Sequence, residues 1–67
     1  MFIKDPNTDT KVNLSNVLWT RTEETRFHPI GEDPYPEYII VFYFSGAICQ
    51  AFRFRDERER DLFYNMI

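Results

Sequence analysis

The side chains best suited to catalysis are few in this sequence, and their spacing matches no catalytic arrangement. His28 is the only histidine and Cys49 is the only cysteine. A catalytic base needs a nucleophile and an orienting partner within reach. His28 sits beside Pro29, and no serine or cysteine follows at a motif-like spacing. We therefore interpret His28 as a surface loop residue, and we do not expect an enzyme.

Metal and phosphate sites are also not expected. One histidine and one cysteine cannot supply the four ligands of a structural zinc site. The carboxylates Glu32, Asp33 and Glu37 form an acidic run, but prolines interrupt the regular ligand spacing that a calcium loop requires. Gly31 and Gly46 are the only glycines, and neither lies in a strand-to-helix phosphate loop. The sequence indicates neither a metal nor a cofactor.

Aromatic and basic residues alternate in the segment Phe52-Arg53-Phe54-Arg55. Proteins that bind single-stranded nucleic acid pair stacking rings with a basic groove. Side chains two positions apart share one face of a strand, so here the rings point one way and the arginines the other. The net charge of −3 also opposes phosphate binding. The sequence thus does not favour nucleic acid as a ligand, while Arg53 and Arg55 stay candidates for binding a smaller anion.

The length of 67 residues predicts a single domain, residues 1–67. Chains this small usually gain stability from a disulfide, a metal or a partner subunit. A lone cysteine excludes an internal disulfide and favours the reducing cytoplasm. The N-terminus lacks the pattern of a secretory signal, and the apolar run 38–44 is far shorter than the roughly 20 residues that cross a bilayer. We expect a soluble cytoplasmic protein.

The first half of the chain predicts short strands. Residues 2–4 suit a strand, and the turn formers of 5–9 favour a hairpin after it. Residues 11–25 read as a second strand with a bulge near Ser15-Asn16, where the apolar parity shifts. Residues 26–37 hold three of the four prolines and are predicted to form a connection rather than a strand.

This proline-rich connection has two interpretations. It is either a stiff surface loop that covers the sheet, or a loop that binds a partner. The binding interpretation rests on side chains with rings or charge, namely Phe27, His28, Tyr35 and Glu37.

The clearest element is a hairpin of residues 38–44 and 47–55. Its first arm is apolar at every position, which is typical of a strand covered on both faces. A three-residue loop with Gly46 in the left-handed conformation would pair Tyr43 with Ala47, whereas a two-residue loop would exchange the faces. In the first register the bulky aromatic residues share one face. The other face carries smaller side chains, which are Ile39, Val41, Tyr43, Ala47, Cys49 and Ala51. Cys49 is interpreted there as a buried apolar residue.

A helix is predicted to begin after Asp56, whose carboxylate suits an N-cap. Its apolar stripe should dock on the bulky aromatic face of the sheet, and consists of Leu62, Phe63, Met66 and Ile67. The predicted fold class is α+β, a small antiparallel meander of three to four strands with one C-terminal helix packed on one face. Trp19 and most other aromatic residues are assigned to the core of so small a domain.

The functional expectation follows from the uncovered face. One short helix covers only one face of a sheet, and exposed apolar surface usually marks a partner site. We expect a non-enzymatic homo-oligomeric interaction module that binds, and inhibits or regulates, another protein. The small size and the acidic, aromatic loop also fit a phage-type antagonist of a host factor. Two alternatives are a nucleotide or small anionic ligand bound at a subunit interface, and single-stranded nucleic acid.

Overall fold

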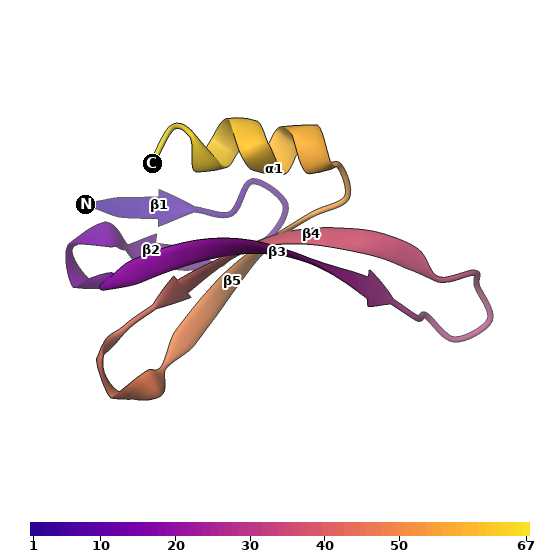
Figure 1. Ribbon diagram of the computed structural model, residues 1–67, viewed down its shortest axis with the longest axis horizontal. Coiled ribbons are helices and arrows are strands. Elements are labelled where there is room, and N and C mark those ends of the chain that lie inside the picture. The colour runs from indigo at the N-terminus through magenta and orange to yellow at the C-terminus, as the bar shows by residue number, and fades with distance from the viewer.

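The chain folds into two antiparallel sheets and one C-terminal helix (Figure 1). The computed structural model describes residues 1–67. A two-stranded sheet consists of β1 (Phe2–Lys4) and β2 (Lys11–Asn13). A three-stranded sheet, in the order β3-β4-β5, consists of β3 (Trp19–Phe27), β4 (Tyr35–Tyr43) and β5 (Cys49–Phe54). The helix α1 (Glu57–Tyr64) follows, and the α+β prediction is confirmed.

The predicted N-terminal hairpin is confirmed. The backbone amide of Asp5 donates to the carbonyl of Thr10 over 2.9 Å, which closes the turn between β1 and β2. Ile3 lies opposite Val12, and Val12 is buried in the core of the domain. The hairpin therefore stabilises the larger sheet through its apolar side chains.

The irregularity predicted near Ser15-Asn16 exists, but it is not a bulge. The chain forms a short 3-10 turn, η1 (Leu14–Asn16), which ends β2 and leads into β3. The side chain of Asn13 accepts a hydrogen bond from the backbone amide of Ser15 over 3.1 Å and so caps this turn. The single strand expected over residues 11–25 is thus two strands that belong to different sheets.

The prediction that residues 26–37 form only a connection is wrong at both ends. β3 continues to Phe27, and β4 already begins at Tyr35, so Pro36 lies within a strand. The hydrogen bond from Phe44 to the carbonyl of Ile48 shows that even-numbered residues of β4 direct their backbone groups toward β5. Since β5 ends opposite Tyr38, the missing N–H of Pro36 faces a position with no strand to accept from it.

The β4–β5 hairpin has a longer loop than predicted. Tyr43 lies opposite Cys49 instead of Ala47, because Ser45–Ala47 forms a second 3-10 turn, η2. Gly46 has the predicted left-handed conformation (φ 79°), and Ala47 adopts it as well (φ 61°). The error in pairing is two residues, and side chains alternate with a period of two. The predicted division of the hairpin into two faces therefore holds.

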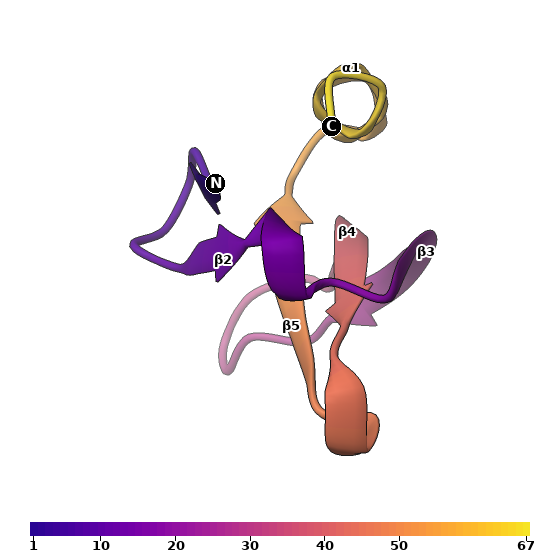
Figure 2. The same cartoon turned by 90° about the vertical axis from the view of Figure 1, so that its left-hand side faces the viewer.

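The core lies between α1, the N-terminal hairpin and one face of the three-stranded sheet (Figures 1 and 2). Asp56 caps the helix by accepting from the backbone amide of Arg58 over 2.8 Å. The Phe63 ring packs 5.7 Å from those of Phe52 and Phe54, so the prediction that the helix docks on the bulky aromatic face is confirmed. The other residues of the predicted stripe, Leu62, Met66 and Ile67, are exposed and do not belong to this contact. No helix is both long and apolar enough to cross a bilayer. The buried cluster consists of Val12, Ile40, Phe42, Phe52 and Phe54.

Candidate functional site

One face of the three-stranded sheet has no helix or further strand over it (Figure 1). We call it the open face. The strand register places on it most of the site residues expected from the sequence, although the sequence had divided them among a loop, a sheet face and an anion site. The open face consists of Trp19, Arg21, Glu23, Thr25 and Phe27 of β3, Tyr35, Glu37, Ile39, Val41 and Tyr43 of β4, and Cys49, Ala51 and Arg53 of β5, with Arg55 just beyond.

The centre of the open face is not the exposed apolar surface that the sequence predicted. Ile39 is only 6 % exposed and Val41 only 5 %. Both lie on the central strand, and Val41 is flanked by Arg21 and Ala51 on the neighbouring strands. Because no other element covers them, the side chains beside them do so.

Charged side chains form two ion pairs across the open face. A guanidinium nitrogen of Arg21 lies 2.9 Å from Oε2 of Glu23, along β3. A guanidinium nitrogen of Arg53 lies 3.4 Å from Oε1 of Glu37, across β5 and β4. These pairs give the middle of the face a mixed-charge surface above buried aliphatic residues.

An aromatic cluster marks one end of the open face. The rings of Trp19 and Tyr43 stack with centroids 3.8 Å apart and planes within 5° of parallel. The Arg21 guanidinium lies 5.6 Å from the centroid of the Tyr43 ring. Trp19 remains 53 % exposed, which corrects its assignment to the core. Its register opposite Tyr43 places it on the uncovered face.

A second aromatic cluster marks the other end. Phe27 and Tyr35 are cross-strand neighbours with ring centroids 5.4 Å apart. The Arg55 guanidinium lies 3.6 Å from the centroid of Tyr35, a cation–π contact. Three of the four residues assigned to the predicted binding loop, Phe27, Tyr35 and Glu37, therefore lie in strands.

The remaining loop, residues 28–34, projects beyond the end of the sheet (Figure 1). His28 lies in it and is exposed, as the sequence predicted. Ile30 is also exposed, so the loop does not bury it against the sheet. Ile39 and Val41 are therefore covered by strand side chains, and the covering role considered for the loop does not apply to them.

Cys49 and Ala47 differ from their expected places. Cys49 is exposed rather than buried, because it lies on the edge strand β5 where no further strand covers it. Ala47 is exposed in the η2 turn and does not belong to the sheet face. Of the smaller apolar residues predicted to form the face, only Ile39 and Val41 are buried, while Tyr43 and Ala51 are half-buried.

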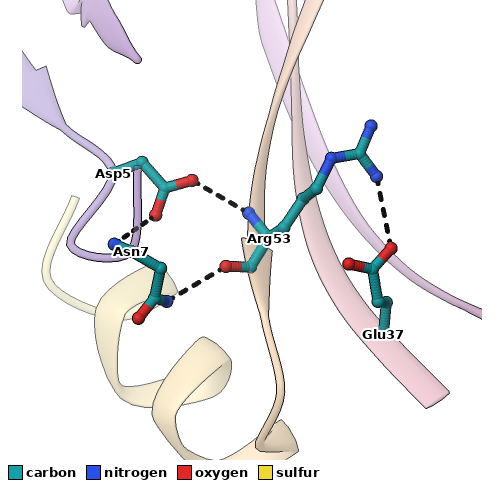
Figure 3. Close-up of polar contacts among 4 residues, drawn as sticks. All are labelled: Asp5, Asn7, Glu37 and Arg53. Carbon is teal, nitrogen blue, oxygen red and sulfur yellow. Dashed lines mark hydrogen bonds and ion pairs between the residues drawn. The ribbon is translucent and has the colours of Figure 1, made fainter. Parts of the chain in front are cut away.

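The turn of the N-terminal hairpin holds β5 by its backbone (Figure 3). Oδ2 of Asp5 accepts from the backbone amide of Arg53 over 3.1 Å, and Nδ2 of Asn7 donates to the Arg53 carbonyl over 3.0 Å. Oδ1 of Asp5 accepts from the backbone amide of Asn7 over 2.9 Å. Asp5 and Asn7 thus take the place of a neighbouring strand at this one residue, and we call the arrangement the Asp5–Asn7 clamp.

The clamp and the Trp19 cluster could not be predicted from the sequence. Asp5 and Asn7 were recognised only as turn formers, and nothing near them in the sequence indicates a contact with β5. For Trp19, the available signal was the alternation of side chains along β3, which places Trp19 and Tyr43 on the same face once the two strands are paired. That signal becomes informative only when the β3–β4 register is known.

The two arginines proposed for anion binding are already engaged. Arg53 pairs with Glu37, and Arg55 stacks on Tyr35. An anion would have to compete with the Glu37 carboxylate for Arg53. No three histidine, cysteine or carboxylate side chains are grouped so as to hold a metal ion.

No protein-family model matches this sequence, and neither the curated proteins nor the solved structures compared with it show a significant match.

Proposed function

We propose that this chain is a non-enzymatic, oligomeric interaction module that binds another protein through the open face. The observation that carries the proposal is the pair of aromatic–arginine clusters, one at each end of that face. Residues that dominate protein–protein affinity are enriched in tryptophan, tyrosine and arginine. Trp19, with about half of its surface exposed, is the strongest single anchor.

The size of the open face suits a protein partner. The eight residue steps from Trp19 to Phe27, at about 3.3 Å each, separate the two clusters by roughly 26 Å. A standard interface covers about 800 Å² on each partner, which corresponds to a patch roughly 28 Å across. A globular protein surface can therefore contact both clusters at once.

The mixed charge between the clusters supports selectivity. Arg21–Glu23 and Arg53–Glu37 present both signs of charge over a short distance. Charged groups at an interface contribute more to specificity and association rate than to affinity. We propose that the partner carries a complementary arrangement of acids and bases. Binding in the cytoplasm would then regulate or inhibit the partner by covering its surface, as a phage-type antagonist would.

Single-stranded nucleic acid is a second candidate, and one observation favours it. The open face combines an exposed ring, Trp19, with arginines on the same side of the sheet. Arg53 and Arg55 point away from the phenylalanines of their own strand, so the ring on their side of the sheet comes from β3. Against this candidate stand the net charge of −3 and the pairing of two open-face arginines with glutamates. Oligonucleotide binding that weakens steeply with added salt would favour it over a protein partner.

The anionic-ligand alternative depends on Arg53 and Arg55. It predicts a compound absorbing near 260 nm that copurifies with the protein, and Arg55→Ala should release it. A protein without such a compound, and without measurable nucleotide binding, would eliminate this alternative.

Affinity capture from the native host tests the main proposal. The immobilised wild-type chain should retain a partner that the Trp19→Ala variant loses. Leu62→Ala is the matched control, because Leu62 is an exposed apolar residue on α1 and does not belong to the open face. Equal retention by all three proteins, with native circular dichroism spectra, would contradict the role of the open face.

A further inference from the structure

The outer edge of β5 carries backbone groups that no strand of this chain engages. The Arg53 amide and carbonyl point outward, to Asp5 and Asn7. Backbone groups alternate in direction along a strand, so those of Ala51 and Cys49 point outward as well. β5 is the last strand in the order β3-β4-β5, and the clamp engages only Arg53.

The two edges of the sheet differ in how they are protected. Natural edge strands discourage association by placing charges, prolines or bulges along the edge. Four of the seven residues in the β3 segment 20–26 are charged. Residues 47–52, which include the first four residues of β5, carry no charge and no proline, and Ile48 among them is 60 % exposed. The β3 edge is therefore protected, whereas the β5 edge is not.

The unprotected part of β5 is also accessible. The start of β5 and the η2 turn extend away from α1 and from the N-terminal hairpin in both views (Figures 1 and 2). A strand added there would meet no other element of the chain before it reached the Asp5–Asn7 clamp.

We propose that this edge pairs with β5 of a second copy, antiparallel, about a two-fold axis at Gln50. The two three-stranded sheets would then form one continuous, twisted sheet, with the open faces of both copies on the same side of it. The inference rests on the oligomeric part of the proposed function. It assigns the contact to the strand edge instead of the apolar face, because Ile39 and Val41 are already buried within one chain.

The residues of β5 fit self-pairing in this register. Cys49 lies opposite Ala51 of the second copy, and each outward amide meets an outward carbonyl. Gln50 lies opposite its own copy, and side-chain amides both donate and accept hydrogen bonds, so the pair is self-complementary. The clamp at Arg53 ends the pairing and keeps that cation away from the axis. These features favour a second copy over an unrelated extended peptide.

The contact is small, so the dimer dissociates readily. Residues 48–52 span roughly 17 Å of strand. Pairing over that length buries less than the roughly 1,200 Å² of a stable interface. The dimer should therefore form and dissociate within the micromolar to millimolar range of protein concentration, and the molar mass should rise with concentration from 8.2 kDa toward twice that value.

A charge exchange at Gln50 tests the axis. Gln50 is exposed, so Gln50→Lys and Gln50→Glu should both fold. Each variant alone places like charges opposite each other and should weaken self-association by about tenfold or more. An equimolar mixture of the two should associate at least as tightly as the wild type, measured by sedimentation equilibrium. Asn65→Lys, an exposed position at the end of α1, is the control and should leave association unchanged.

Several results would overturn this inference. One is a wild-type mass that stays at 8.2 kDa up to millimolar concentration. Another is self-association that neither Gln50 variant weakens, which would place the contact elsewhere. A monomeric wild type that loses a captured partner on Gln50→Lys would assign the edge to a strand of that partner. Loss of capture in Trp19→Ala with association intact would instead support the open-face proposal and leave the β5 contact standing on its own data.

Discussion

The carboxylate of Asp5 accepts a hydrogen bond from the backbone amide of Arg53 over 3.1 Å, although 48 positions separate the two residues in the chain. Asp5 has no exposed surface, and its second oxygen accepts from the Asn7 amide. A buried carboxylate whose oxygens are both engaged fixes the first hairpin against the last strand. Through Arg53, which pairs with Glu37, this contact also orients the open face.

Asp5→Ala should destabilise the domain by about 1–3 kcal/mol, because two backbone amides at part-buried sites lose their acceptor. Denaturant unfolding followed by circular dichroism measures this change. Asp9→Ala is the control: Asp9 is exposed and pairs only with Lys4 at 3.5 Å, so its loss should change stability by less than about 0.5 kcal/mol. Equal effects of the two substitutions would refute the structural role of the clamp.

Phe63→Ala should lower the free energy of unfolding by about 3 kcal/mol. The substitution removes a ring that packs on Phe52 and Phe54, on the face of the sheet that the helix covers. That loss is large against the stability of a domain this small. Leu62→Ala, next to it but exposed, should have little effect. An unchanged denaturation midpoint for Phe63→Ala would mean that α1 is not docked on the sheet.

Tyr38 should make folding sensitive to high pH. Partial burial, with the nearby carboxylates of Glu24, Glu57 and Asp56, raises the pKa of Tyr38 above its ordinary value of 10.0. The unfolded chain then loses this proton first, so the contribution of Tyr38 to stability is fully present below pH 10 and is lost as the pH rises beyond it. Tyr38→Phe removes the ionisable hydroxyl. The stability of the variant should fall less steeply than that of the wild type between about pH 9 and about pH 11, and identical slopes would contradict the shift.

The faces of the β4–β5 hairpin could be predicted from the sequence, while its pairing could not. Side-chain alternation depends only on parity, so an error of two residues in register left every face assignment intact. The register itself depended on the loop, where Ala47 adopts the left-handed conformation beside Gly46. A non-glycine residue in that conformation is uncommon, and no local pattern predicted it.

The composition of the open face lay beyond sequence reasoning for a different reason. Trp19 stacks on Tyr43 because β3 and β4 pair across the loop 28–34, which is too long to impose one turn type and one register. Proline at position 36 also suggested that β4 began later than it does. Pro36 is tolerated in β4 because its nitrogen points past the end of β5, where no strand needs an N–H donor. Where β5 ends relative to Pro36 is known only from the tertiary structure.

The affinity of the captured partner for open-face variants tests the central claim most directly. Isothermal titration calorimetry should show that Trp19→Ala weakens binding by at least about 1 kcal/mol, roughly fivefold. The melting temperature of this variant, measured separately, should stay close to that of the wild type. Leu62→Ala, an exposed apolar residue outside the open face, should bind as the wild type does. If folded Trp19→Ala binds the partner as tightly as the wild type and the Leu62→Ala control, the open face is not the recognition surface.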